Sequence, residues 1–151
     1  MGHNPVNHPA RPIYRAIGGL TGVYLVLFGV LGIVETSGGE FFAQDDTLVL
    51  GQGTNLGNSL LSAVLGAIIL VATLIGRNVD TAVNKLLGYV LMAFGLANLA
   101  VLRTDANYLN FSVATAIVLM IIGQVLLLAG MYGKVGSDEE AKAFESARLV
   151  S

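Results

Sequence analysis

Four long uncharged apolar runs constrain the fold of this chain more than any other feature of its sequence. The last run, residues 111–132, reads FSVATAIVLMIIGQVLLLAGMY and contains no charge and no proline. A helix of that length is about 33 Å long, and the hydrocarbon core of a bilayer is about 30 Å thick. Three earlier runs have the same character, at residues 16–34, 58–75 and 86–102. The sequence therefore predicts four membrane-spanning helices.

The short connections between these runs favour an all-α fold, a polytopic four-helix antiparallel bundle. We expect residues 1–15 to form an N-terminal tail, residues 16–133 the transmembrane domain, and residues 134–151 a C-terminal tail. Ser137 and Glu140 have the spacing of a capping box, which predicts a short amphipathic helix in that last tail. Residues 35–57 form a polar loop with four carboxylates and no Lys or Arg. The carboxylates lack the spacing of a calcium-binding loop, so we interpret the segment as a solvated acidic loop.

Glycines recur on one face of the predicted helices. Small residues let helix backbones approach closely in lipid, where apolar burial does not by itself drive helices together. Three of the spans carry glycine pairs seven residues apart, and seven residues are almost two helical turns. We therefore predict close helix packing at Gly18, Gly22, Gly29, Gly66, Gly88, Gly95, Gly123 and Gly130.

The distribution of basic residues predicts how the chain is oriented in the membrane. Seven of the eight Lys and Arg residues lie in the two tails or in the turn between the second and third spans. Cytoplasmic segments carry such an excess of basic residues. We expect a multi-pass protein of the plasma (inner) membrane with both termini in the cytoplasm. Its predicted topology anchors are Arg11, Arg15, Arg77, Lys85 and Lys134.

The predicted spans contain no catalytic or metal-binding constellation. The chain has no cysteine, its two histidines lie in the N-terminal tail, and no ionisable side chain falls within the four spans. Small drug exporters need a membrane-embedded carboxylate, and haem-binding bundles need axial histidines. Asp80, in the turn before the third span, is expected to cap that helix. We predict a protein that is not an enzyme and has no cofactor and no bound metal. The net charge of −2 gives no argument for a nucleic-acid partner.

Six uncharged polar residues remain as candidate intramembrane sites. At about 1.5 Å per residue, Gln124 falls level with Thr21 and Thr73 in the membrane. One interpretation is that these side chains form hydrogen bonds between helices, each worth about 0.6–2 kcal/mol. The other is a polar pocket, lined by Gln124, Thr21 and Thr73, that holds a lipid headgroup or a small ligand. The full set is Gln124, Asn98, Thr21, Thr73, Ser62 and Thr115.

The stretches that lead into the second and fourth spans are similar to each other. TNLGNS at residues 54–59 aligns with NYLNFS at residues 107–112. This similarity raises the hypothesis of a duplicated helical hairpin, which six positions alone do not establish.

Several stretches together resemble a known family. They are HNPVNHPARPIYR before the first span, FFA and LGxGTN in the following loop, LLSAVLGAIIL in the second span, RTDANYLNFS before the fourth, and LAGMYGKVG at its end. They look like the actinobacterial membrane proteins grouped as domain-of-unknown-function family 4383, over residues 3–136. The resemblance implies four spans, an actinobacterial and in particular mycobacterial plasma membrane, and no catalytic motif.

These features lead to one expected function and one alternative. The expected function is an accessory or stabilising subunit of a larger envelope membrane complex, with Mce-type lipid import machinery as the preferred host. Its partners are then the lipid bilayer and other integral membrane proteins. The alternative is a stand-alone small transporter or lipid-binding four-helix bundle.

Overall fold

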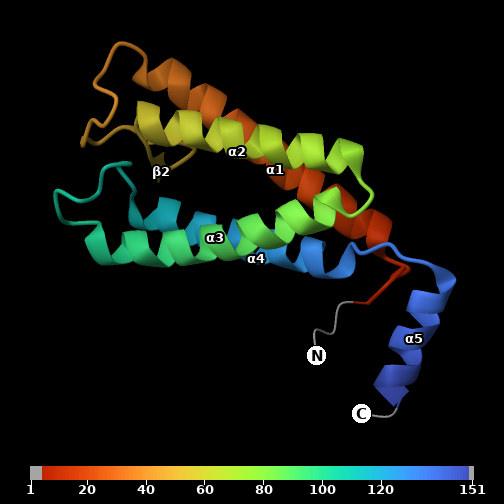
Figure 1. The fold of residues 1–151 in the computed structure, drawn as a ribbon. Coiled ribbons are helices and arrows are strands. Elements are labelled where there is room, and N and C mark those ends of the chain that lie inside the picture. The colour runs from red at the N-terminus through yellow and green to blue at the C-terminus, as the bar shows by residue number, and fades with distance from the viewer. Residues whose placement is uncertain (1–4, 150–151) are drawn as a thin grey trace.

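The structure, a computed structural model, describes residues 5–149 as an all-helical chain with one small β-hairpin (Figure 1). Four of its helices are long and apolar enough to span a membrane, which confirms the four apolar helices expected from the sequence. A short fifth helix follows them, and the hairpin lies in the loop between the first two. The elements are α1 (Arg11–Thr36), β1 (Leu48–Val49), β2 (Gln52–Gly53), α2 (Leu56–Ile75), α3 (Val79–Val101), α4 (Val113–Tyr132) and α5 (Asp138–Leu149).

Three helices begin earlier than the sequence predicts, and the two longer extensions, those of α1 and α3, contain charged residues. Helix α1 begins at Arg11 rather than at residue 16, because Pro12 suits the first turn, where a helix needs no backbone N–H donor. Helix α3 begins at Val79 rather than at residue 86. Asp80 therefore lies inside the first turn of α3 and is not its cap. The N-cap is Asn78, in a left-handed conformation with φ of 71°.

The backbones approach most closely within two helix pairs, α1 with α2 and α3 with α4. A Cβ added at Gly66 would lie 2.6 Å from the carbonyl oxygen of Gly22. A Cβ added at Gly88 would lie 2.8 Å from the carbonyl oxygen of Gly123, and the reverse distance is also 2.8 Å. Real Cβ atoms do not come so close to a backbone oxygen, so only glycine permits these two contacts. Each pair is thus a tightly closed helical hairpin.

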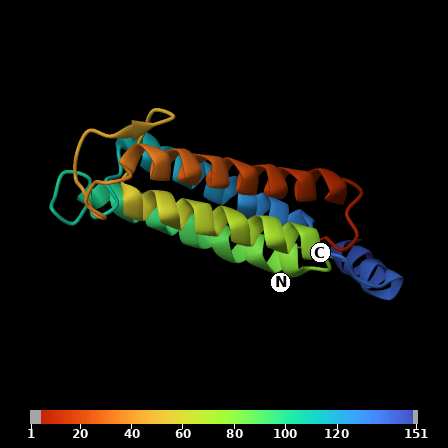
Figure 2. The ribbon, with the colours of Figure 1, turned by 90° about the horizontal axis from the view of Figure 1, so that it is seen from above.

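The two hairpins meet through larger side chains. The shared core holds buried residues from all four long helices, namely Leu25, Ile69, Leu91, Ile122 and Leu126. In Figure 1, α1 and α2 diverge from α3 and α4 toward the end that carries the β-hairpin, and Figure 2 shows the four helices running alongside one another. We call the β-hairpin end, with residues 37–55 and 102–112, the loop end. The other end, with residues 5–15, 76–79 and 133–138, is called the terminal end.

The second helices of the two hairpins have the same internal spacing. Helices α2 and α4 each have 20 residues, and they begin after the capping residues Asn55 and Ser112. Gly66 and Gly123 each follow their cap by eleven residues. When the two halves are aligned on their N-cap residues, Asn55 therefore corresponds to Ser112. The alignment of residues 54–59 with 107–112 pairs Asn55 with Tyr108 instead, and so is displaced by about one helical turn.

Candidate functional site

The structure does not bring the three residues of the predicted intramembrane pocket together. The Oγ1 atoms of Thr21 and Thr73 donate hydrogen bonds to carbonyl oxygens of their own helices, Ile17 at 2.9 Å and Ile69 at 2.8 Å. Gln124 is exposed on α4. The prediction of a pocket shared by Gln124, Thr21 and Thr73 is therefore wrong. Side chains at equal depth need not face one another, because depth does not fix the direction in which each helix points them.

The other three polar candidates are buried, and one of them makes a hydrogen bond to a different element. The amide of Asn98 donates to Phe94 O in the same helix at 2.9 Å. Ser62 Oγ lies 3.5 Å from the side chain of Asn58, also in its own helix. Thr115 Oγ1 of α4 donates to Gly53 O of β2 at 2.8 Å. Thr115 therefore ties the β-hairpin to the start of α4.

Buried asparagine side chains close the loop end. The amide nitrogen of Asn55 donates to Ala43 O at 3.0 Å and to Tyr108 O at 2.8 Å, and its Oδ1 caps α2. The amide of Asn110 donates to Thr54 O at 3.0 Å from the opposite loop. Both asparagines are less than one-tenth exposed. These contacts join the loop after α1 to the loop after α3. The sequence did not predict this network, although asparagines cluster where the two loops lead into helices.

Asp45 is the acidic residue attached to this network. The backbone N–H of Thr47 donates to Asp45 Oδ1 at 2.9 Å, and Asn110 donates to the same oxygen at 3.2 Å. The backbone bond from Thr47 makes the largest contribution in lowering the pKa of Asp45 below its ordinary value of 3.8. The Thr47 side chain and Asn110 act in the same direction. The loop therefore holds Asp45 as a carboxylate.

An ion pair between Arg15 and Asp80 joins three helices at the terminal end. Arg15 Nε of α1 lies 3.6 Å from Asp80 Oδ2 of α3, and it donates to Thr73 O of α2 at 3.1 Å. Asp80 is 3% exposed and is the only buried carboxylate in the part of the chain that the structure describes. The expectation that the spans contain no ionisable side chain is therefore wrong for α1, which contains Arg15, and for α3, which contains Asp80. The two residues are 65 positions apart, so only the packing of α1 against α3 reveals the pair.

Two buried oxygen atoms next to this ion pair make no hydrogen bond within the described residues. They are Thr81 Oγ1 and Asn84 Oδ1. Asn84 packs on Gly18, where an added Cβ would lie 2.7 Å from the amide nitrogen of Asn84. Gly18 thus permits the close contact of α1 with α3, whereas Gly22 permits the close contact of α1 with α2. The ion pair and the contact of Asn84 with Gly18 hold α1 against α3 in this polar layer.

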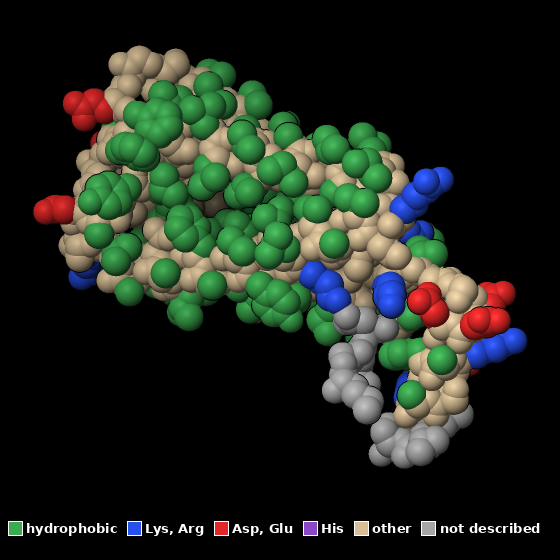
Figure 3. Space-filling model, in the orientation of Figure 1, with side chains coloured by type: hydrophobic (Ala, Val, Ile, Leu, Met, Phe, Trp, Pro, Cys, Tyr) green, Lys and Arg blue, Asp and Glu red, His purple; other side chains and the backbone are tan. Residues whose placement is uncertain are grey.

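A groove between α1 and α2 opens at the terminal end. Its volume is about 630 Å³, and two arginines, Arg11 and Arg15, line one part of it. The remaining lining is apolar apart from Thr73 of α2. Figure 3 shows that Lys and Arg side chains gather at this end of the molecule, whereas the acidic side chains visible on the surface of the long-helix region lie at the loop end. The groove therefore combines an apolar wall with a basic end.

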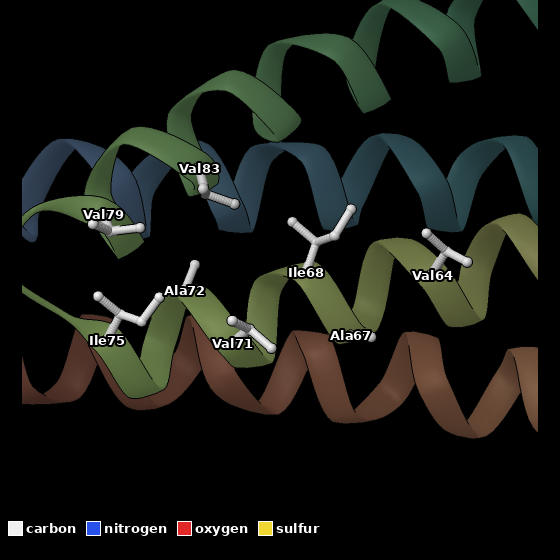
Figure 4. A pocket seen from close by; sticks show the side chains of 8 residues that line it. All are labelled: Val64, Ala67, Ile68, Val71, Ala72, Ile75, Val79 and Val83. Carbon is white, nitrogen blue, oxygen red and sulfur yellow. The ribbon is translucent and has the colours of Figure 1, made fainter.

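A second groove lies between α2 and α3, where these helices begin to diverge (Figure 4). Its volume is about 400 Å³. All the lining side chains are aliphatic, and no charged or polar group fixes the orientation of an occupant. The lining residues are Val64, Ala67, Ile68, Val71, Ala72, Ile75, Val79 and Val83.

Comparisons with known proteins do not assign this chain to a family. No protein-family model matches it, and no curated protein or solved structure matches it either. The resemblance to family 4383 therefore stays a prediction. The four apolar helices indicate a multi-pass membrane protein, with polar layers at the two ends of its helices and grooves along their sides.

Proposed function

We propose that the protein is a non-catalytic accessory subunit that contacts a helix of another membrane protein through the exposed face of α4. The four long helices would form an antiparallel membrane-spanning bundle, with both termini in the cytoplasm. The observation that carries this proposal is the exposed amide of Gln124.

Gln124 interrupts an otherwise apolar surface. The exposed stripe of α4 contains Val113, Ile117, Ile121, Gln124 and Leu128, whose spacing places them on one face of the helix. Gln124 is the twelfth of the 20 residues in α4, about 17 Å along a helix about 30 Å long. It therefore lies near the middle of the apolar span, away from both polar interfaces.

The energetics of lipid favour a partner for this side chain. Gln124 makes no hydrogen bond within the described residues, although its amide can both donate and accept. An amide in hydrocarbon gains about 0.6–2 kcal/mol from a hydrogen bond to another helix. A partner helix with a polar residue at the same depth would satisfy the amide and cover the apolar stripe around it.

The charges at the two ends support the proposed orientation. Arg11, Arg15, Arg77 and Lys134 belong to the terminal end, and a basic excess is typical of the cytoplasmic side. The acidic loop would then lie outside. The preferred host, Mce-type lipid import machinery in an actinobacterial envelope, rests on the sequence resemblance alone.

The proposal is tested by site-specific photocrosslinking followed by mass spectrometry. A photoreactive amino acid would replace Gln124 in the chromosomally tagged protein, and the matched control would carry it at Leu74 of α2, which is 81% exposed. We expect an adduct with a second membrane protein from position 124 and none from position 74. That protein should co-purify in mild detergent, and Gln124→Leu should reduce its recovery.

Two outcomes would contradict the proposal. A crosslink to a second copy of this chain would identify a homodimer rather than an accessory subunit. Crosslinks to lipid alone, with the protein recovered by itself, would favour the stand-alone transporter or lipid-binding bundle.

A further inference from the structure

We propose that the groove between α1 and α2 binds an anionic phospholipid, with its phosphate at Arg11 and Arg15 and one acyl chain along the helices. This site is independent of the proposed contact at Gln124. It uses different helices, and its occupant is a lipid rather than a protein.

The shape of the groove fits one lipid chain. Its volume of about 630 Å³ falls within the range of about 300–1,000 Å³ that is typical of ligand sites. Leu20 and Val23 of α1 and Leu70 of α2 provide apolar walls. Gly19 leaves space between them, since an added Cβ would already lie 3.4 Å from Thr73 Cγ2. A side chain larger than alanine at this position would therefore reduce the apolar part of the site.

The basic end of the groove has donors left for a phosphate. Arg11 Nε donates to Gly133 O at 2.9 Å, which fixes the guanidinium. The two terminal nitrogens of Arg11 make no hydrogen bond to any described residue. The guanidinium of Arg15 is likewise fixed, by a hydrogen bond to Thr73 O and by the ion pair with Asp80. Arginine is suited to this role because its planar fork of N–H groups matches phosphate oxygens.

The charge balance of the groove favours an anion. Asp80 is the carboxylate next to Arg15 and offsets one of the two positive charges. No carboxylate lines the groove itself, so the charge of Arg11 has no acidic partner there. Basic pockets between membrane helices on the cytoplasmic side bind the headgroups of acidic lipids. An anionic headgroup therefore complements the site, and a zwitterionic one complements it less well.

The length of the groove agrees with the depth of one leaflet. Arg15 and Val23 are eight residues apart, which is about 12 Å along the helix. Half of the hydrocarbon core is about 15 Å thick. A headgroup at the arginines would thus lie at the interface, with its chain running toward the bilayer centre. The groove between α2 and α3 lacks any charged lining residue and offers no such selectivity.

Native mass spectrometry of the purified full-length protein tests this site. Delipidated protein in detergent would be titrated with phosphatidylglycerol or with phosphatidylcholine carrying identical chains. We expect tighter binding of phosphatidylglycerol. Arg11→Gln should weaken that binding about fivefold, the effect of one basic residue near a membrane surface. The matched control, Arg77→Gln, removes an exposed arginine at the same end that does not line the groove, and should leave binding unchanged.

A second variant tests the position of the acyl chain. Gly19→Leu would obstruct the apolar part of the groove and keep both arginines, so it should reduce phosphatidylglycerol binding, with helix content checked by circular dichroism. Three results would overturn the proposal: equal binding of the two lipids, an equal loss in Arg77→Gln, or unchanged binding by a folded Gly19→Leu protein. None of these measurements depends on a protein partner at α4.

Discussion

At the scale of single residues, the Arg15–Asp80 ion pair is a charged contact between two of the long helices. Breaking a buried pair is costly because one charge then stays behind without compensation. Here Arg15 keeps its bonds to Thr73 O and its side chain is 36% exposed, so the cost is reduced. The pair is best understood as a contact that holds three helices in position, rather than as a large contribution to stability.

Removing the carboxylate of this pair should loosen the terminal end. We expect Asp80→Ala to lower the free energy of unfolding by about 2–3 kcal/mol, below the upper values for fully buried pairs. Unfolding by sodium dodecyl sulfate in mixed micelles would measure it. Glu145→Ala on the exposed face of α5 is the control and should change the free energy by no more than about 0.5 kcal/mol. Equal effects of the two substitutions would contradict the role given to Asp80.

The lowered pKa of Asp45 predicts a pH dependence at the loop end. The folded state favours the carboxylate, so its contribution to stability is fully present above the ordinary pKa of 3.8. The contribution is lost as the pH falls below 3.8 and through the lower pKa of the folded state. An NMR titration in micelles, which follows the side-chain amide of Asn110, should give a midpoint below 3.8. Asp45→Asn should abolish that transition, and a midpoint at or above 3.8 would rule out the interpretation.

At the scale of helices, glycine pairs determine how closely each hairpin closes. Gly22 with Gly66 and Gly88 with Gly123 bring backbone against backbone in the two halves. The sequence predicts that these positions pack. Gly22, Gly88 and Gly123 each have a second glycine seven residues further on, and Gly66 lies on a small-residue face of its helix. The sequence did not assign partners to the stripes. Gly18 faces Asn84 of α3, although it lies only one turn from Gly22, which faces α2.

A large side chain at one of these glycine contacts should push apart the two helices of the hairpin. We expect Gly66→Leu to lower the free energy of unfolding by about 3 kcal/mol, at the upper end of typical overpacking costs, because the obstructing group is a backbone oxygen. Ala67→Leu on the exposed neighbouring position is the matched control and should have little effect. The same detergent unfolding assay applies to both variants. Similar stability of the two proteins would show that the close approach at Gly66 is not required.

Helix boundaries illustrate which local signals can be predicted. The capping box of α5 was expected from Ser137 and Glu140, and the structure contains both of its hydrogen bonds, at 3.2 Å each. The sequence predicts a start of α3 at residue 86, which is too late, because Asp80 and Lys85 resemble the polar end of a turn. The charge of Asp80 enters the helix since Arg15, from a distant part of the chain, compensates it.

At the scale of the whole molecule, the proposed orientation can be tested directly. The chain has no cysteine, so a single introduced cysteine reports on one position without interference. We expect Gly39→Cys, in the acidic loop, to react with a membrane-impermeant maleimide on intact cells. Ser137→Cys, next to α5, should react only after lysis. The reverse pattern would invert the proposed topology.

The sequence by itself determined the number of apolar helices, because hydrophobicity and length are local properties. It also indicated which glycines share a stripe. Only the tertiary structure decided which face of each helix points inward. In a membrane protein the lipid-facing and core-facing surfaces are both apolar, so hydrophobic periodicity does not distinguish them. For this reason Gln124 was expected inside and is exposed, whereas Asp80 was expected in a turn and is buried against Arg15.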